Sequence, residues 1–468
     1  MTTALLSRPF FFVGIGGSGM LPLAAIVQGL GAQVAGSDRS YDQGRTPEKF
    51  AWMVRKGFEL FPQDGSGVTS PDQVLVASAA IEATVPEVAR ANALGCERMS
   101  RAELLAELFN ASPVAIGVAG TSGKSTTTGM LGWIMAQTGH EPTIMNGAVM
   151  KNFVSPDEPF ASAVVGGGQC FVSEVDESDG SIALYRPSVA LLLNVSLDHK
   201  SMDELRVLFG DFLASAARAA VNIDNAEVRA LLNRAADPVT FGIDSADADI
   251  SIEPGSIVDE PTSIAARIVA QGVPYALHLP MPGRHNLANA LAAIAGAHAA
   301  GVAVADAVQA LHGFKGLARR FDIVGTSASG ITVIDDFGHN PEKCRATLHT
   351  LKSHPGRVLA FFQPHGYGPL RQMGAELAQT FAEELGPEDH TILCDPVYFG
   401  GTVDRSEGSE RIVNLIIDHG SSAEYITARE DCAIRLRQLA RAGDRIVVMG
   451  ARDDTLTEFA RGLLASLG

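Results

Sequence analysis

The sequence predicts an α/β protein in which parallel sheets are joined by helices and the chain is divided into about three domains. Short apolar runs bounded by glycine alternate with longer stretches of helical periodicity, which is the pattern of parallel strands with crossover helices. The chain has 468 residues, and a usual domain has about 150. Two glycine-rich turns, FVGIGGSG from residue 12 and GTSGKS from residue 120, each follow an apolar run and precede a helical pattern. Each turn alone suggests a nucleotide site.

The apolar runs fall into three groups along the chain. The expected strands are residues 10–13, 33–35, 74–77, 114–118, 171–175, 189–193, 331–334, 358–362, 391–394 and 445–449. A helix is expected within residues 101–113, where leucines recur at helical spacing before an Asn/Ser/Pro stop. Residues 250–279 predict edge strands with a turn at Gly272, Val273 and Pro274. The expected domains are residues 1–111, 112–320 and 321–468.

The composition argues against a broad electrostatic surface for nucleic acid or anionic lipid. The formal net charge is −17, so most of the surface repels phosphate. The five cysteines are scattered without CxxC spacing, which predicts reduced, mostly buried thiols in a cytoplasmic protein. The apolar run at residues 9–15 is too short to span a bilayer and has no cleavage-like site, so it predicts a buried strand.

The turn GTSGKS predicts a phosphate-binding loop, because an apolar strand leads into it and a helix follows. The loop comprises Gly120, Thr121, Ser122, Gly123, Lys124 and Ser125, with Thr126 next. In such a loop, backbone N–H groups hold phosphate oxygens, the lysine neutralises the terminal phosphates and the hydroxyl binds Mg²⁺. A full GxxxxGK[ST] motif has glycine where Val118 stands, so this is a shorter form. A purely structural turn is the alternative.

Polar side chains follow the next two expected strands of the same group. They are Glu174, Asp176, Glu177 and Asp179 after one strand, and Asn194, Asp198 and His199 after the other. The carboxyl ends of parallel strands form the ligand edge of an α/β sheet, so these groups are expected beside the phosphate loop, where carboxylates suit a hard cation. A solvated acidic loop is the alternative. Further along, His285 and Asn286 come just before a helical pattern, which Asn286 would cap while facing a ligand.

The first glycine turn satisfies the dinucleotide fingerprint. Gly14, Gly16 and Gly19 have the GxGxxG spacing after a strand and before a helix, and Asp38 ends the next strand about twenty residues on. By itself this pattern favours an NAD-dependent oxidoreductase. No catalytic set for hydride transfer is evident beside it, so the turn is equally suited to the diphosphate of another nucleotide.

These motifs, in this order, resemble those of the Mur ligase family over essentially the whole chain. The matching stretches are residues 120–127, 174–180 and 194–199, GRHNLANALAA from residue 283, RRFD at 319–322, DDFGHNP at 335–341 and FQPHGY at 362–367. The resemblance implies a Rossmann-like N-terminal domain, a central P-loop ATPase-like domain and a C-terminal Rossmann-like domain. It implies a ligase of peptidoglycan precursor metabolism that joins an amino acid, L-alanine in the nearest branch, to UDP-N-acetylmuramate through an acyl phosphate, with ATP and Mg²⁺.

The resemblance also implies roles for individual residues. Lys124, Glu174 and His199 would be catalytic, and Ser125, Glu174 and His199 would be linked to the metal. ATP would be held by residues 120–126 with His285, Asn286, Arg319, Arg320 and Asp336. The UDP-linked substrate would be held by Gly14, Gly16, Gly17, Ser18, Gly19, Ser37, Asp38 and Ser78, with Asp38 meeting the uracil. The amino-acid site would comprise His339, Asn340, His365 and Arg371.

The chain departs from the alanine-adding branch at several positions. Ser122 stands where that branch usually has histidine, and Asn340 where it tends to have histidine. The last-domain motif of that branch usually reads like FQPHRYTR, with two arginines, whereas this chain has Gly366 and Gly368 in the same stretch. These differences keep open a sibling ligase that joins a peptide or uses another carboxylate, and a catalytically silent nucleotide-binding regulator. The expected partners are small molecules, without nucleic acid or membrane insertion, and the expected assembly is a monomer or homodimer.

Overall fold

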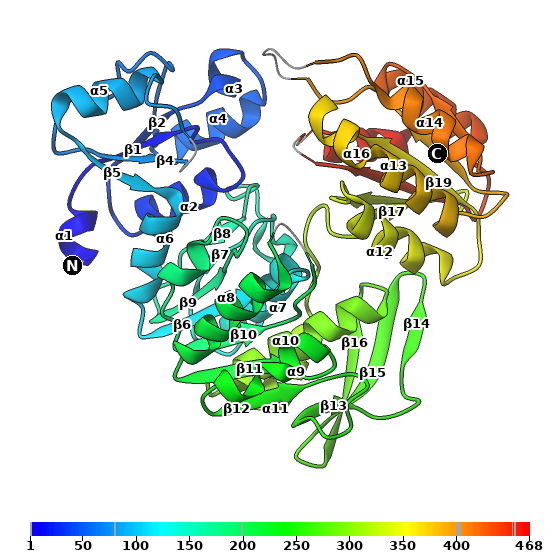
Figure 1. Cartoon of the computed structure of the whole chain (residues 1–468), viewed down its shortest axis with the longest axis horizontal. Coiled ribbons are helices and arrows are strands. Elements are labelled where there is room, and N and C mark those ends of the chain that lie inside the picture. The colour runs from blue at the N-terminus through cyan, green and yellow to red at the C-terminus, as the bar shows by residue number, and fades with distance from the viewer. Residues whose placement is uncertain (1, 79–80, 198–199, 399–403, 452, 454) are drawn as a thin grey trace. The chain divides into compact units, whose positions relative to one another are not determined.

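The computed structural model describes residues 2–78, 81–197, 200–398, 404–451, 453 and 455–468. It divides into two compact units, which we describe separately. The first comprises the chain up to Val258 with Ile264–Leu279 and Arg284–Lys315; the second comprises Asp259–Ser263, Pro280–Gly283 and Gly316–Gly468. Helices alternate with strands along the chain, and the strands form three largely parallel sheets, which confirms the predicted α/β class (Figure 1). The predicted domain boundaries stay predictions.

The N-terminal sheet of the first unit has five parallel strands in the order β3-β2-β1-β4-β5. They are β1 (Phe10–Val13), β2 (Val34–Ser37), β3 (Glu59–Phe61), β4 (Val74–Ala77) and β5 (Glu97–Ser100). The helices are α1 (Thr2–Leu6), α2 (Met20–Gly29), α3 (Arg39–Asp42), α4 (Pro47–Arg55), α5 (Pro86–Leu94) and α6 (Arg101–Asn110). The strand order reverses between β1 and β4, which is where a doubly wound sheet opens its ligand crevice.

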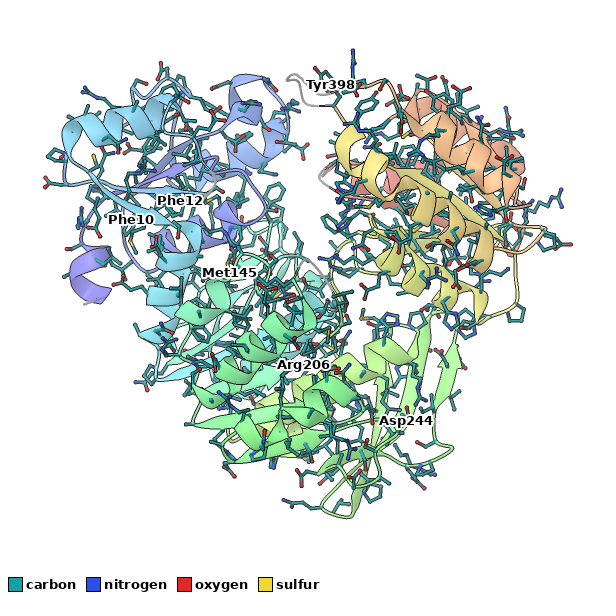
Figure 2. The ribbon with its side chains drawn as sticks, viewed as in Figure 1. Phe10, Phe12, Met145, Arg206, Asp244 and Tyr398 are labelled. Carbon is teal, nitrogen blue, oxygen red and sulfur yellow. The ribbon has the colours of Figure 1, made fainter. Side chains whose placement is uncertain are left out.

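Strand β1 is buried on both faces, as its unbroken apolar run predicts. Phe10 and Phe12 lie on one face with ring centroids 6.4 Å apart, and both are labelled in Figure 2. Phe11 points to the opposite face and packs on Phe61, 6.2 Å away. The strand is therefore fixed between two helical layers, and the glycine turn that follows it has a rigid base.

The second sheet has eleven strands, ordered β14-β15-β13-β12-β11-β10-β6-β9-β7-β8 with β16 paired to β15, and all of them except most of β14 and the first residue of β15 belong to the first unit. The strands are β6 (Val114–Ala119), β7 (Thr143–Met145), β8 (Ala163–Val164), β9 (Cys170–Glu174), β10 (Val189–Leu192), β11 (Arg218–Asn222), β12 (Pro238–Phe241), β13 (Ile250–Ile252), β14 (Val258–Glu260), β15 (Ser263–Ala270) and β16 (Val273–Leu279). The helices are α7 (Lys124–Gln137), α8 (Met202–Ala214), α9 (Ala226–Ala230), α10 (Arg284–Ala299) and α11 (Val304–Leu311), with short 3₁₀ turns η1 (Lys151–Phe153), η2 (Ser181–Leu184) and η3 (Leu232–Arg234).

The centre of this sheet is parallel, and β6 lies between β9 and β10. Helix α7, which follows β6, packs against α10 and α11, and its Met130, Leu131, Ile134 and Met135 are fully buried. The predicted edge strands at residues 250–279 are present, but their turn lies at Gln271 and Gly272, where φ is +51° and +75°. Val273 and Pro274 already belong to β16, because a two-residue hairpin turn needs left-handed backbone at both positions.

The sheet of the second unit has six strands in the order β17-β18-β22-β19-β20-β21, with only β17 antiparallel. They are β17 (Asp322–Thr326), β18 (Thr332–Asp336), β19 (Val358–Gln363), β20 (His390–Leu393), β21 (Ala423–Tyr425) and β22 (Arg445–Gly450). The helices are α12 (Pro341–Lys352), α13 (Tyr367–Glu384), α14 (Ser409–Asp418), α15 (Arg429–Leu439) and α16 (Leu456–Ser466). The four strands predicted here are present within one or two residues.

Two further expectations concern the chain as a whole. Cys170, Cys344, Cys394 and Cys432 are buried and Cys96 is partly buried, and all five are free thiols, as predicted. Among the described residues, no helix combines the length and the apolar character needed to cross a membrane.

Candidate functional site

The predicted phosphate loop joins β6 to α7 and is shaped by two glycines. Gly120 has φ +140° and Gly123 has φ +88°, conformations that residues with a Cβ rarely adopt. A Cβ on Gly120 would lie 2.9 Å from the Cβ of Leu193, and one on Gly123 would lie 2.5 Å from Oδ1 of Asn289. Both glycines are therefore required by close neighbours as well as by backbone conformation.

Asn194, at the end of β10, holds the loop in place with both ends of its side chain. Its Oδ1 accepts from the Ser122 N–H at 2.9 Å, and its Nδ2 donates to the Ser122 carbonyl at 2.9 Å. Its carbonyl accepts from the Thr121 N–H at 3.1 Å, and the Thr121 hydroxyl bonds to Ser196. The loop therefore has a fixed shape that a ligand need not impose.

Lys124 is the first residue of α7, and its ammonium group lies over the loop. Nζ donates to the Gly120 carbonyl at 2.7 Å and forms an ion pair with Oε2 of Glu177 at 2.9 Å. Both side chains are largely buried, at 17% and 6% exposure. A cation held at the N-terminus of a helix, beside the unpaired N–H groups of its first turn, forms a binding site for anions.

Ser125 and Glu174 place oxygen atoms next to this cation. The Ser125 hydroxyl donates to Oε2 of Glu174 at 3.1 Å, and Oε1 of Glu174 accepts from the Gly147 N–H. Among the residues that the structure describes, no group of three or more Asp, Glu, His and Cys is placed to bind a metal. Mg²⁺ usually keeps several waters and takes only one or two protein oxygens beside phosphate, so this donor pair fits it.

Asp176 follows Glu174 and stays a carboxylate in this environment. Burial would raise its pKa, but the Ser178 N–H and the charge of Lys124 outweigh burial and hold the pKa below its usual value. Its Oδ1 accepts from the Ser178 N–H at 3.0 Å. Glu177 and Asp176 of the acidic stretch therefore lie around Lys124, as the topology predicted, whereas Asp179 is exposed and pairs with Arg101 at 3.9 Å.

The remaining residues predicted for this site differ in their positions. Thr126 is buried in the first turn of α7. His285 is exposed and Asn286 is buried, and both lie inside the first turn of α10, which begins at Arg284. Asn286 is therefore not the cap that the sequence suggested. Asp198 and His199 lie outside the described residues.

The first glycine turn, between β1 and α2, is fixed by Asp38. Oδ2 of Asp38 accepts from the Gly16 N–H at 2.9 Å, and Oδ1 accepts from the Ser40 N–H at 2.7 Å as the cap of α3. Both carboxylate oxygens therefore bond to backbone N–H groups of the protein, in the place where the sequence predicted a contact with the nucleoside.

The turn still presents groups to a ligand. Gly14 has φ +72° with no atom near its missing Cβ, the Gly17 N–H bonds to the Gly14 carbonyl, and Gly17 and Ser18 are exposed. In the described part of the chain, no backbone acceptor faces the N–H groups of Ser18 and Gly19. These N–H groups can bind an anion at the start of α2.

A cavity of about 460 Å³ opens beside this turn, at the point where the strand order reverses. Its lining residues are Val13, Gly14, Arg39, Gln63, Ile81, Val85, Pro86 and Glu87. The Ser37 hydroxyl is buried and donates to Oε1 of Glu87 at 2.6 Å, so it supports the wall of the cavity. Ser78 is exposed after β4. The cavity is of the size usual for a small-molecule site.

The three ATP residues predicted in the second unit all contact other groups of that unit. Arg319 is 9% exposed and donates to the carbonyls of Gly450 and Asp453 at 2.7 and 3.0 Å. Asp336 accepts from the Phe321 and Gly338 N–H groups and the Thr347 hydroxyl. Arg320 is half-buried, and its guanidinium lies 4.7 Å from the centre of the Phe337 ring.

Of the four residues predicted for the amino-acid site, His339 and His365 are in contact. The rings of His339 and His365 meet edge to face at 5.0 Å. Burial lowers the pKa of His339 to about 4, and its Nδ1 donates to the Phe337 carbonyl at 2.9 Å, which leaves Nε2 as an acceptor. Asn340 caps α12 through the Lys343 N–H, and Arg371 pairs with Asp404 at 2.7 Å.

Sequence reasoning missed several residues that shape these sites. Asn289 and Glu87 gave no local signal, since their partners Thr127 and Ser37 are 162 and 50 residues away. Asn194 and Glu177 were visible as polar residues after strands, but the pairing of Asn194 with Ser122 and of Glu177 with Lys124 was not. A polar residue at a strand end near a glycine loop is the signal that could have found these two.

Comparison with known proteins supports the family resemblance along the chain. Three family models match: "Mur ligase family, catalytic domain" at residues 9–113, "Mur ligase middle domain" at 118–297 and "Mur ligase, glutamate ligase domain" at 319–452. The chain is 34% identical to the UDP-N-acetylmuramate–L-alanine ligase of Cereibacter sphaeroides over 473 residues, which is 98% of this chain and 96% of that protein. It is 34% identical to the enzyme of the same name from Agrobacterium fabrum, over 97% and 96% of the two chains.

Solved structures share the fold. The UDP-N-acetylmuramate-alanine ligase of Thermotoga maritima has a TM-score of 0.77 at 23% identity, covering 98% of this chain and 99% of that one. A murein peptide ligase of Psychrobacter arcticus has a TM-score of 0.71 at 24% identity, with the same coverage. With its full-length relatives at 34% identity, the chain belongs to the Mur ligase family.

Proposed function

We propose that this chain is an ATP-dependent ligase of peptidoglycan precursor synthesis that joins L-alanine to UDP-N-acetylmuramate. Its full-length curated relatives carry that activity in their names. The observation that carries the proposal is the placement of Lys124 over a glycine loop, with Ser125 and Glu174 beside it. A triphosphate needs this combination of backbone N–H groups, a cation and oxygen ligands for Mg²⁺.

The reaction that the family resemblance implies has two displacements. The substrate carboxylate attacks the γ-phosphorus of ATP, the bond to the ADP oxygen breaks, and an acyl phosphate forms. The amino group then attacks the acyl carbon, inorganic phosphate leaves, and the nitrogen loses a proton. Bound Mg²⁺, held by Ser125 and Glu174 and by His199 if the family role applies, would neutralise charge on the phosphates.

Lys124 supports the first displacement. Its ammonium group would turn from Glu177 to the β- and γ-phosphates, which carry more charge than one carboxylate. Glu177 keeps that ammonium over the loop before ATP binds. Because the pair is largely buried, its charges act in a medium of low dielectric and stabilise a developing charge more strongly than they would in water.

The N-terminal sheet would hold the UDP-linked acid. Gly14, Gly17, Ser18 and Gly19 would contact the diphosphate, with the nucleoside in the cavity beside them, while Asp38 and Ser37 act by fixing the turn and the cavity wall. The second unit would supply Arg320 to ATP, and His339 and His365 to the amine. The Nε2 of neutral His339 can accept a hydrogen bond from the amino group.

A sibling ligase that adds a peptide is the second candidate. A Cβ on Gly368 would meet no atom within 4 Å, and one on Gly366 would meet only Pro369. This open space lies in the stretch where the alanine-adding branch usually has arginines, and it would suit a larger amine. We further propose domains at residues 1–111, 112–320 and 321–468 and a cytoplasmic monomer or homodimer.

The test is phosphate release from ATP by the purified chain with UDP-N-acetylmuramate and a panel of amino acids and short peptides. The proposal expects release that needs Mg²⁺, the acid and L-alanine, with a product heavier than the acid by one alanine residue. Release with a peptide alone would assign the sibling activity. No release with any pair, or reduction of NAD by a 2-hydroxy acid, would contradict a ligase. Glu174→Gln is expected to raise the Mg²⁺ concentration needed for half-maximal release, and the exposed Glu158→Gln is its control.

A further inference from the structure

Glu87 is a buried carboxylate with one oxygen that has no partner. It is 0% exposed, in the first turn of α5. Its Oε1 accepts from the Ser37 hydroxyl at 2.6 Å, whereas its Oε2 has no hydrogen-bond partner in the described part of the chain. A buried acceptor without a donor is unfavourable, so such groups are rare in folded proteins and often face a ligand or water.

The position of Glu87 favours a ligand as the missing partner. It lines the cavity beside the first glycine turn, together with Arg39, Gln63 and the apolar side chains of Val13, Ile81 and Val85. Its place at the N-terminus of α5, in a helix of nine residues with Pro86 at the first position, favours a negative charge there. The Ser37 hydroxyl fixes one oxygen and leaves the other without a donor until a ligand supplies one.

Asp38, which the sequence assigns to the nucleoside, is already bound to the protein. Both of its oxygens accept from backbone N–H groups, those of Gly16 and Ser40. The acceptor that dinucleotide folds place after the second strand therefore holds the backbone of the turn here, whereas Oε2 of Glu87 bonds to no group of the described chain. Glu87 reaches the same end of β2 from α5, through Ser37, the last residue of β2.

We infer that Glu87 is the specificity-determining acceptor for the nucleoside of the UDP-linked substrate, receiving one N–H or O–H donor of the uridine. This inference rests on the proposed function. The uridine offers two donor types to a carboxylate, the imide N–H of the base and the hydroxyls of the ribose. Cytosine has no imide N–H, and its ring nitrogen would repel the carboxylate, so an imide contact would also exclude cytidine nucleotides.

The test is the affinity of the full chain for UDP, measured by calorimetry on wild type and on Glu87→Gln. Glutamine has almost the same volume, so the cavity keeps its shape. Loss of a hydrogen bond to a charged group is expected to weaken UDP binding by about tenfold to a hundredfold. Glu82→Gln removes the same charge from an exposed position of the same segment and is expected to leave the affinity unchanged.

Analogues of UDP distinguish the two donors. If the base is read, wild type binds 3-methyl-UDP and CDP as weakly as Glu87→Gln binds UDP, and the variant loses its preference for UDP over CDP. If the ribose is read, 2′-deoxy- or 3′-deoxy-UDP shows the loss instead. Equal affinity of wild type and Glu87→Gln for UDP would overturn the inference.

Thermal melting separates recognition from a structural role. The ligand-free Glu87→Gln variant is expected to melt close to the wild-type temperature, because removal of the unpartnered carboxylate offsets the loss of a favourable charge at the N-terminus of α5. A lower melting temperature with unchanged UDP affinity would mean that Glu87 serves the fold only, and would also overturn the inference. If wild type itself fails to bind UDP, the proposed function fails and not merely the role of Glu87.

Discussion

The two glycine turns share a backbone plan but differ in the charges that surround them. Each follows the central strand of a parallel sheet and opens a helix, and each has a lysine on a glycine carbonyl: Lys49 on Gly16 at 3.3 Å and Lys124 on Gly120 at 2.7 Å. In the first turn, Asp38 takes up the Gly16 N–H. In the second, an uncharged amide, Asn194, holds the backbone, and the carboxylates of Glu174 and Glu177 lie on Ser125 and Lys124.

This difference shows how one backbone motif can serve either binding or chemistry. An acid that bonds to the turn itself makes the turn rigid and adds no group that can act on a phosphate. In the second turn, the acids bond to Lys124 and Ser125 instead. These two side chains can turn from the acids to a bound phosphate and its Mg²⁺. Variants of the two turns and their neighbours test this comparison, from the largest expected effect to the smallest.

Lys124→Ala is expected to lower phosphate release by about 10²- to 10³-fold, because it removes the cation next to the transferred group. UDP affinity should be unchanged. Lys49→Ala is the matched change in the first turn and is expected to raise KM for the UDP-linked acid without a loss of kcat. Steady-state kinetics of both variants measure these effects. If Lys49→Ala reduced kcat as strongly as Lys124→Ala, the first turn would not serve binding alone.

Gly123→Ala is expected to destabilise the first unit by about 3 kcal/mol, since strain at φ +88° adds to a contact of 2.5 Å with Asn289. Gly139→Ala, at φ +79° with no atom within 4 Å, should cost only about 1 kcal/mol. Urea unfolding followed by circular dichroism measures both. An equal loss in the two variants would mean that Asn289 moves aside and does not restrain the loop.

Asp38→Asn is expected to weaken binding of UDP by about threefold to tenfold, the effect of losing one hydrogen bond, and to leave KM for ATP unchanged. The change loosens the turn without touching the nucleoside. Binding of UDP and CDP would be compared by calorimetry. If this variant changed the preference between UDP and CDP, Asp38 would contact the nucleoside directly, as the sequence suggested.

Asp176 gives the smallest expected effect, on the pH dependence of stability. Its pKa in the folded chain lies below the unfolded value of 3.8, so the carboxylate stabilises the fold above that pH. The stabilisation is lost as the pH falls through the folded pKa. Melting temperatures of wild type and Asp176→Asn, measured between pH 7 and pH 3, should therefore differ less below pH 3.8 than at pH 7. A constant difference over this range would mean that the proton does not bind at Asp176.

The parts of the fold that could be predicted from the sequence are those with a local pattern. Buried strands such as β1 and β4 are unbroken apolar runs, and the order strand, glycine turn, lysine, helix at residues 114–137 is typical of a phosphate-binding loop. Strands β3 and β5 were missed because they lie at the sheet edges with exposed, charged residues. Strand β11, RAAVN, was missed because its alanines favour helix as much as strand.

The candidate site could be predicted only as far as single side chains carry their own signal. Lys124 and Ser125 do so, but Glu174 depends on the order of strands in the sheet. The bond of Asp38 to the Gly16 N–H could not be predicted, because this partner is chosen by the path of the turn and not by residue type. The role inferred for Glu87 could not be predicted, because it depends on a buried oxygen without a hydrogen-bond donor, and no sequence pattern indicates such an atom.

The contact between the start of α7 and α10 affects the order in which the chain folds during synthesis. Thr127 and its partner Asn289 are separated by 162 residues. A ribosome that adds about 5–20 residues per second would need roughly 8 to 32 seconds to make the intervening chain. During that interval the turn has left the ribosome without the helix that completes it. The nascent N-terminal sheet, whose strands end at Ser100, can therefore fold well before the phosphate loop reaches its final form.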